Sequence, residues 1–317
     1  MGISVFPDDD QLFCGMIGTH GVKMANAAVN ECDVLFLVGA RVGDRAVKTP
    51  LALELSLIHL SIRRQRQMCI RDRIIHIDID PAEIGKNIGA DLPLVGDAKL
   101  VLQQMTELAK PMKHDEWIAH IKTLGGERKY VEPAKGTVNP RVFIDRLAKK
   151  MPANVTVVAD VGQNQIWTCT EYKFRKEGRL LTSGGMGTMG YSVPAAIGAK
   201  MADDSRATVA ICGDGAFQMS FMELATAVQF GVDIKVVVMT NNRLGMVREL
   251  QTNGYHDRQT AVFLDGSPDF IKLAEAYSIP AMRVYDDDTM EKGIEMLAEH
   301  KGICLVEVVV DKDMPTL

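Results

Sequence analysis

Short apolar runs rich in β-branched residues alternate along the chain with stretches in which apolar residues recur every three to four positions. The apolar runs lack polar alternation, as expected of strands that helices cover on both faces. The pattern therefore predicts an α/β protein with parallel sheets. We expect strands at Val34–Val38, Ile74–Ile79, Val155–Ala159, Thr208–Cys212, Ile234–Met239 and Cys304–Val310, and helices at Ala98–Leu108, Pro140–Lys150, Val193–Met201, Met222–Phe230, Pro268–Tyr277 and Thr289–His300.

A stretch rich in Gly, Lys, Glu and Pro, residues 126–138, lies between two halves that each carry this pattern. Such a composition is typical of a linker. The length of 317 residues fits two domains, at roughly 100–200 residues each. The predicted fold class is thus α/β with two doubly wound parallel-sheet domains, residues 1–125 and residues 139–317.

Residues 51–73 depart from the pattern, because a basic tract, Ser61–Arg73, stands where a helix with an apolar stripe is expected. One interpretation is a basic interaction loop, and another is a surface insertion. A third is foreign sequence introduced by cloning or assembly. The third is favoured, since the patterns on both sides of the tract are intact.

The net charge of −5 gives no reason to expect nucleic acid or an anionic membrane as a partner. The six cysteines are scattered, without a C-x-x-C pair, and several lie in apolar runs, which suits a reducing compartment. No apolar stretch is long enough to span a membrane, and the N-terminus does not have the pattern of a signal peptide. The sequence therefore predicts a cytoplasmic protein.

The strongest chemical signal is Gly213-Asp214-Gly215 at the end of an apolar strand, followed one helix and one strand later by Asn241-Asn242. Glycines at such a turn let the backbone approach a phosphate at the start of a helix. Asp214 offers a carboxylate to a divalent cation such as Mg²⁺. Asn241 would come from the end of the adjacent parallel strand. The alternative is an ordinary glycine turn without a ligand.

Two other glycine-containing segments follow predicted strands. Residues 183–190 form a glycine-rich loop that enters a helix of small residues, which suits either close packing or a loop beneath a cofactor ring. Residues 161–167 form a strand-to-helix turn with Gly162 at the helix start, which is a natural anion site.

These motifs resemble the thiamine-diphosphate enzymes, and residues 161–167, 183–199 and 243–251 resemble acetolactate synthases in particular. The resemblance implies Mg²⁺ ligation by Asp214, Asn241 and the backbone carbonyl of Arg243, with Asn242 outside the metal shell. It implies contacts with thiamine diphosphate at Val161, Gly162, Gln163, Asn164, Gly187, Met189, Gly213, Asp214, Gly215, Ala216, Asn241, Gly245 and Met246.

Three of these positions, and Leu250 in addition, acquire specific roles from the resemblance. The carbonyl of Met189 would accept a hydrogen bond from the aminopyrimidine of the cofactor. Asn164 stands where the family has a diphosphate-binding His, so it retains a donor but loses a chargeable group. Met246 and Leu250 would line the pocket for the second substrate, and Leu250 replaces the Trp usual in the family.

The first half of the chain resembles the central, FAD-binding domain of the same family in residues 15–21, 38–45, 75–81 and 95–98. Gly39 and Gly43 follow a strand where a dinucleotide could cross, and Arg41 could bind its pyrophosphate. An α/β domain that has lost its cofactor is the alternative. The resemblance implies FAD contacts at Gly18, Thr19, His20, Gly39, Ala40, Arg41, Arg45, Asp78, Ile79, Gly96, Asp97 and Ala98.

The resemblance further implies a thiamine-diphosphate-dependent transferase that decarboxylates pyruvate and joins the two-carbon unit to pyruvate or 2-oxobutyrate, in the biosynthesis of isoleucine and valine. It implies a homodimer or tetramer and a small regulatory subunit. In the family, an N-terminal domain carries the activating glutamate. We therefore expect no catalytic side chain in this stretch of sequence, a shortened C-terminal tail, and little activity of the chain alone.

Two other functions remain open at this point. One is a different thiamine-diphosphate decarboxylase, oxidase or carboligase. The other is a nucleotide-binding module without catalysis.

Overall fold

The computed structural model describes residues 2–43, 46, 73–125 and 130–317. Within them the chain forms two compact units, residues 14–127 and residues 1–13 together with 128–317. Of the basic segment at 51–73, only Arg73 belongs to the described residues, and it is the first residue of a strand. Arg45, an expected FAD contact, lies outside the described residues.

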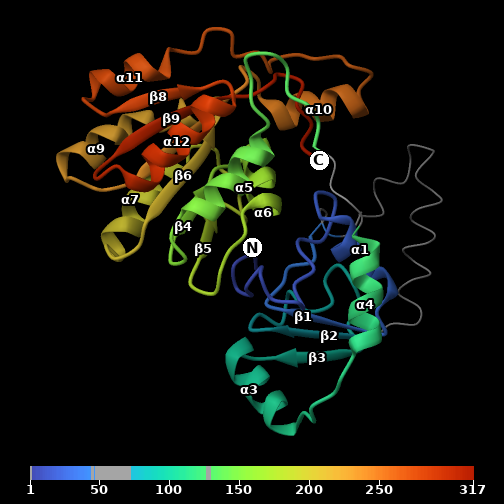
Figure 1. Ribbon diagram of the computed structural model, residues 1–317. Coiled ribbons are helices and arrows are strands. Elements are labelled where there is room, and N and C mark those ends of the chain that lie inside the picture. The colour runs from blue at the N-terminus through green and yellow to red at the C-terminus, as the bar shows by residue number, and fades with distance from the viewer. Residues whose placement is uncertain (1, 44–45, 47–72, 126–129) are drawn as a thin grey trace. The chain divides into compact units, whose positions relative to one another are not determined.

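The smaller unit contains a parallel sheet of three strands in the order β1-β2-β3 (Figure 1). Strand β3 was not predicted, because it is short and contains Pro93. Proline is tolerated at the edge of a sheet, where its missing N–H breaks no ladder. The elements of this unit are β1 Val34–Val38, β2 Arg73–Asp78, β3 Leu92–Val95, α1 Lys23–Glu31, α3 Ala98–Leu108 and α4 Asp115–Leu124.

The larger unit contains a six-stranded, fully parallel sheet in the order β5-β4-β6-β7-β9-β8. Its strands are β4 Thr156–Ala159, β5 Arg179–Thr182, β6 Thr208–Gly213, β7 Lys235–Thr240, β8 Ala281–Val284 and β9 Cys304–Val309. Its helices are α5 Pro140–Lys150, α6 Gln163–Glu171, α7 Ser192–Ala202, α8 Asp214–Phe217, α9 Leu224–Gln229, α10 Gly245–Gly254, α11 Phe270–Ala276 and α12 Asp287–Glu299, with a 3₁₀ turn, η2, at Phe221–Glu223.

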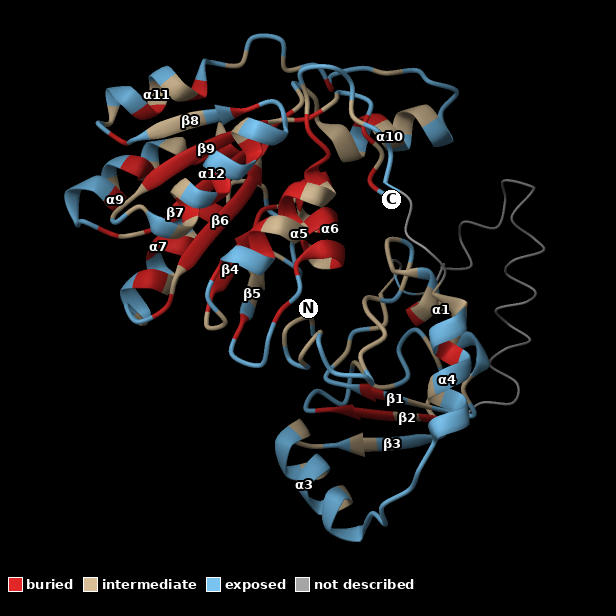
Figure 2. Cartoon of the chain, in the orientation of Figure 1, coloured by how far each residue is buried: buried red, intermediate tan, exposed pale blue. Residues whose placement is uncertain are grey.

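Both faces of the six-stranded sheet are covered, as the sequence predicted. Successive residues of a strand point to opposite faces. Accordingly, Val209 and Ile211 of β6 lie in one apolar cluster with α5 and α12, while Ala210 and Cys212 lie in a second cluster with α7 and α11. The central strands β4, β6, β7 and β9 are buried almost throughout, whereas the outer strands β5 and β8 are more exposed (Figure 2).

Two predicted helices match the structure at both ends. Helices α3 and α5 have the predicted bounds. The side chain of Asn139 accepts from the backbone N–H of Arg141, and Pro140 occupies the first turn of α5, a combination that favours a helix start. The edge strands β5 and β8 were missed, because each is only partly buried and contains an exposed arginine, Arg179 or Arg283, so neither is an unbroken apolar run.

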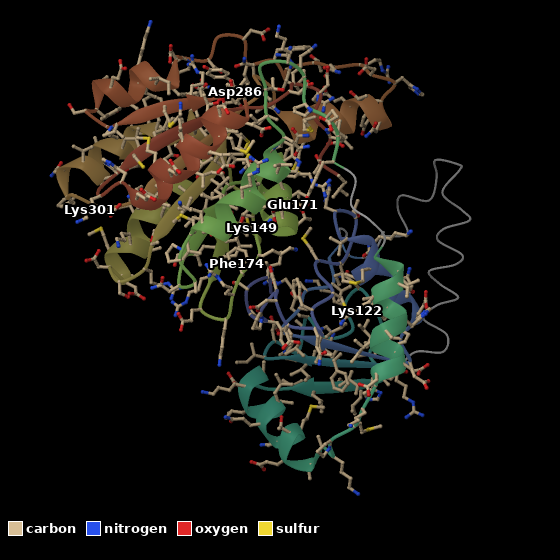
Figure 3. The ribbon with its side chains drawn as sticks, viewed as in Figure 1. Lys122, Lys149, Glu171, Phe174, Asp286 and Lys301 are labelled. Carbon is tan, nitrogen blue, oxygen red and sulfur yellow. The ribbon has the colours of Figure 1, made fainter. Side chains whose placement is uncertain are left out.

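Residues 1–13 belong to the larger unit, although they precede the smaller unit in the chain. The carboxylate of Asp8 accepts from the backbone N–H of Phe174, which is labelled in Figure 3, at 3.0 Å. The hydroxyl of Ser4 accepts from the N–H of Leu180 at 2.9 Å. Val138, in the predicted linker, is buried and donates its N–H to the carbonyl of Val309. Among the described residues, no helix is long and apolar enough to cross a membrane.

Candidate functional site

The motifs of the larger unit gather at one edge of its sheet. They follow β5, β4, β6 and β7, which are four adjacent parallel strands. The chain runs from β4 outward to β5 and then back to β6 on the other side of β4, so strand order reverses between β4 and β6. Ligands of open α/β sheets bind outside the carboxyl ends of the strands at such a point.

Asp214 directly follows β6 and is 2% exposed. Its Oδ2 accepts from the backbone N–H groups of Asn241 at 3.1 Å and Asn242 at 2.6 Å, and its Oδ1 accepts from Gly215 at 2.8 Å. Burial raises the pKa of this carboxyl from 3.8 to about 6, outweighing the backbone hydrogen bonds that lower the pKa. A nearby cation would therefore favour the ionised form strongly.

Asn241 directly follows β7 and connects two motifs. Its Oδ1 accepts from the backbone N–H of Arg243 at 3.1 Å, and its Nδ2 donates to Oε1 of Gln163 at 3.2 Å. The next residue, Asn242, has a φ of +54°, which asparagine tolerates better than most residues. The turn is fixed from outside by backbone hydrogen bonds to Val262 and Leu264.

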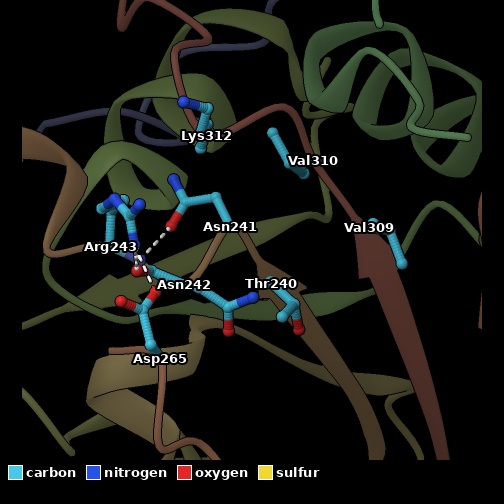
Figure 4. Close-up of a pocket in the computed structure, with 8 residues that line it drawn as sticks. All are labelled: Thr240, Asn241, Asn242, Arg243, Asp265, Val309, Val310 and Lys312. Carbon is cyan, nitrogen blue, oxygen red and sulfur yellow. Dashed lines mark hydrogen bonds and ion pairs between the residues drawn. The ribbon is translucent and has the colours of Figure 1, made fainter. Parts of the chain in front are cut away.

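A hollow of about 200 Å³ opens at the carboxyl ends of β7 and β9 (Figure 4). Arg243 lies within it, donates to Asp265 at 2.8 Å and to the carbonyl of Asn242 at 2.7 Å, and lies over the ring of Phe263. The hollow is lined by Thr240, Asn241, Asn242, Arg243, Asp265, Val309, Val310 and Lys312.

The donor set at Asp214 fits a hard cation that is shared with a phosphate ligand. Among the described residues, no group of three His, Cys, Asp or Glu could hold a metal ion. The protein alone therefore offers one carboxylate, with amide and carbonyl oxygens beside it. Mg²⁺ typically binds through one or two carboxylates and completes its octahedron with phosphate oxygens and water. Oδ1 of Asp214 accepts one hydrogen bond and retains a lone pair for such a cation.

The two polar residues that open α6 are held differently. The Nε2 of Gln163 donates to the carbonyl of Met314 at 2.9 Å, while its Oε1 accepts from Asn241. Asn164 is 3% exposed, and its Nδ2 donates to the carbonyls of Asp160 and Ile211 at 2.8 and 3.2 Å. Asn164 thus joins the ends of β4 and β6 with both amide hydrogens, and its expected contact with a diphosphate remains a prediction.

The glycine-rich loop closes on itself and on the Gly-Asp-Gly turn. Gly187 and Gly190 have φ values of +66° and +83°, which only glycine adopts readily. A Cβ on Gly215 would lie 2.7 Å from a methyl of Leu244 and 3.5 Å from the terminal methyl of Met189. A side chain at this second glycine of Gly-Asp-Gly would therefore displace the methyl of Leu244, because the loops that follow β6 and β7 pack closely here.

The other expected contacts of the larger unit lie in the same turns. Val161 and Gly162 precede α6, with Gly162 at a φ of +140°. Ala216 is buried in α8. Met246 and Leu250 lie four residues apart on α10, and hence on one face of that helix, with Leu250 60% exposed.

In the smaller unit, the expected FAD contacts follow the three parallel strands. Gly39, Ala40 and Arg41 follow β1, Asp78 ends β2 and Ile79 follows it, and Gly96 to Ala98 follow β3. Gly39 has a φ of +54° and donates to the carbonyl of Ile77, and Asp97 caps α3. The loop with Gly18, Thr19 and His20 precedes α1 and is closed by hydrogen bonds between Gly18 and Asn26.

The structure adds residues that the sequence did not single out. Glu249 of α10 accepts from the backbone N–H and the hydroxyl of Thr316 and from Nε2 of Gln163. Asp160, at the end of β4, is fully buried and accepts three backbone hydrogen bonds. A lone Asp after a strand and a Glu inside a helix carry no sequence pattern that would have identified them.

Gly245 offers a direct test of the contact between Gln163 and Asn241. A Cβ at this position would lie 1.9 Å from Oε1 of Gln163 and 3.2 Å from Nδ2 of Asn241. We expect Gly245→Ala to displace the Gln163 carboxamide, which is buried, and to weaken Mg²⁺-dependent thiamine diphosphate binding by roughly tenfold. Gly254→Ala, at the other end of α10, is the matched control, because its Cβ would meet only a methyl of Leu250 at 3.9 Å. Equal affinities of the two variants in calorimetry would contradict the expectation.

Comparisons with known proteins agree with this geometry. Residues 160–308 match the thiamine pyrophosphate enzyme, C-terminal TPP binding domain. Residues 1–105 match the thiamine pyrophosphate enzyme, central domain. The first of these matches spans all four strand-end motifs of the larger unit.

Three curated relatives are named as acetolactate synthase large subunits. The chain is 37% identical to a probable acetolactate synthase large subunit of Methanocaldococcus jannaschii, over 98% of this chain and 52% of that protein. It is 33% identical to the acetolactate synthase large subunit of Lactococcus lactis, again over 98% and 52%. It is 34% identical to the acetolactate synthase isozyme 3 large subunit of Escherichia coli, over 98% and 54%. The chain thus spans about half the length of the curated relatives it matches.

Proposed function

We propose that this chain, which belongs to the family of thiamine pyrophosphate enzymes, forms part of an acetolactate synthase catalytic subunit. The observation that carries the proposal is the arrangement at the end of β6. There, a buried carboxylate with a raised pKa faces the Asn turn that follows β7. The names of the curated relatives supply the activity.

In this proposal, Asp214, Asn241 and the backbone carbonyl of Arg243 hold Mg²⁺. Gln163 and the turn at Gly213 and Gly215 bind the diphosphate. The bound cofactor supplies the electron sink on which a 2-oxo acid loses CO₂ and the two-carbon unit is transferred. The protein's own contribution is to fix the metal, to orient the diphosphate through backbone N–H groups, and to seat the second substrate against Met246 and Leu250.

The proposal includes the substrates, a second cofactor, the oligomeric state and the cellular location. The donor substrate is pyruvate, and the acceptor is pyruvate or 2-oxobutyrate. FAD would bind at the carboxyl ends of β1, β2 and β3. We propose a homo-oligomer, a dimer or tetramer, with a small regulatory subunit, acting in the cytoplasm.

The first test is cofactor binding. Titration of the purified chain with thiamine diphosphate should give saturable heat with Mg²⁺ and none with EDTA. Pyruvate turnover by the full protein should then yield acetolactate, measured as acetoin after acid decarboxylation. Acetaldehyde or acetyl phosphate as the product would identify a different thiamine enzyme. No Mg²⁺-dependent binding at all would favour a module without catalysis.

Leu250 tests the assignment of the acceptor pocket. A Trp presents a broad rigid surface to the alkyl end of an acceptor, and one methylene in a pocket is worth about 1–3 kcal/mol. We therefore expect weak discrimination between pyruvate and 2-oxobutyrate, and an increase of roughly tenfold in favour of 2-oxobutyrate in Leu250→Trp. The measurement is the ratio of the two products when the acceptors compete in the full protein. Leu250→Ile, which keeps the volume, should leave the ratio unchanged, and an unaltered ratio in the Trp variant would place specificity elsewhere.

A further inference from the structure

Asp160 is a buried carboxylate to which neither the sequence nor the comparisons assign a role. It directly follows β4 and has no exposed surface. Its Oδ1 accepts from the backbone N–H groups of Val161 at 2.8 Å and Gly190 at 3.0 Å, and its Oδ2 accepts from the N–H of Ser192 at 2.8 Å. Burying a charge is costly unless hydrogen bonds satisfy it, so these three donors fix the carboxylate and are fixed by it.

The donors connect Asp160 to another motif. Gly190 ends the glycine-rich loop that follows β5, and Ser192 is the first residue of α7. One side chain thus joins the end of β4 to the loop beyond its neighbour β5, across the edge of the sheet where the candidate site lies.

The hydrogen bond to Gly190 has a specific geometric consequence. The N–H of Gly190 and the carbonyl of Met189 belong to the same peptide group. A trans peptide group is planar, so its N–H and C=O point in opposite directions, and the described chain contains no cis peptide. By holding the N–H of Gly190, Asp160 therefore sets the direction in which the carbonyl of Met189 points.

We propose that Asp160 is a positioning residue that aims the carbonyl of Met189 at the aminopyrimidine of thiamine diphosphate. This inference rests on the proposed function, in which that carbonyl accepts a hydrogen bond from the cofactor. Asp160 itself does not touch the cofactor. It acts through the peptide between Met189 and Gly190, and it is separate from the carboxylate of Asp214 that serves the diphosphate end.

The test compares ligands that differ only at the aminopyrimidine. Oxythiamine diphosphate carries an oxo group where thiamine diphosphate carries the donating amine, and inorganic pyrophosphate lacks both rings. In the unmodified chain with Mg²⁺, we expect thiamine diphosphate to bind at least tenfold more tightly than oxythiamine diphosphate. In Asp160→Asn, one accepting oxygen becomes an amide nitrogen. The ratio of the affinity for thiamine diphosphate to that for oxythiamine diphosphate should therefore fall to about one, while the affinity for Mg²⁺-pyrophosphate is retained.

A second measurement needs no cofactor. Hydrogen–deuterium exchange of the peptide covering residues 183–192 should become faster in Asp160→Asn, because the amides of Gly190 and Ser192 lose a charged acceptor. The matched control is Asp286→Asn, since Asp286 accepts from the backbone N–H of Thr289 at the start of α12 (Figure 3). This control should change neither the ligand ratio nor exchange in residues 183–192.

The outcomes separate the inference from the function on which it rests. An unchanged ratio in a variant that still binds Mg²⁺-pyrophosphate would overturn the role of Asp160 and leave the proposed function standing. Failure of the unmodified chain to bind thiamine diphosphate would instead overturn the proposed function. If Asp160→Asn does not fold, Asp160→Glu, which keeps the charge but moves it by one methylene, should show the same loss of ratio, and an intact ratio there would also refute the inference.

Discussion

Replacement of Asp214 by alanine should abolish Mg²⁺-dependent binding of thiamine diphosphate. The carboxylate of Asp214 accepts from the backbone N–H groups of both asparagines in the Asn turn. Loss of a residue that merely supports a metal ligand already costs about 10–100-fold in metal affinity. Loss of the carboxylate itself should therefore exceed about 100-fold. Isothermal calorimetry with thiamine diphosphate, with and without Mg²⁺, measures the effect directly.

The two asparagines supply the controls for this experiment. Asn241→Ala should be severe, because its side chain meets both Arg243 and Gln163. Asn242→Gly should be mild, since glycine keeps the φ of +54° and the backbone N–H that donates to Asp214. The reverse order of the two effects would show that the metal contact was assigned to the wrong asparagine.

The stability of the metal-free chain should depend on pH through the same carboxylate. Burial raises the pKa of Asp214 from 3.8 to about 6, so between these values the folded state binds more protons than the unfolded state. Stability then falls as pH rises through this window. The raised pKa of Asp214 contributes about 3 kcal/mol to the free energy of unfolding below pH 4, and this contribution is lost above pH 6.

Asp214→Asn isolates this effect, because asparagine does not titrate. The variant also loses an acceptor for backbone N–H groups, but that loss is the same at every pH. We therefore expect the difference in unfolding free energy between the two proteins to move by about 3 kcal/mol in favour of the variant from pH 4 to 7. Urea denaturation at several pH values without Mg²⁺ gives this difference. Parallel pH profiles would mean that Asp214 titrates normally.

The sequence by itself determined which segments form the sheets and where their chemistry lies. Unalternated apolar runs identified β1, β2, β4, β6, β7 and β9. In β4, β6, β7 and β9 the run lacks polar alternation because both faces of the strand are buried. The spacing of apolar residues predicted α3 and α5 with the bounds that the structure has. Asp214 and Asn241 could be paired in advance, because strands of a parallel sheet end at one edge and their spacing allowed one helix and one strand between them.

The tertiary structure alone decided which residues of these motifs form hydrogen bonds with one another. The amide of Asn164 donates to the carbonyls of Asp160 and Ile211, because it lies buried where strand order reverses. Asp160 meets Gly190 and Ser192 only because β5, an edge strand that the sequence pattern did not reveal, pairs beside β4. Periodicity and capping are local properties that neighbouring residues encode. The partner of a buried carboxylate depends on strand order, which is fixed only when the whole sheet has assembled.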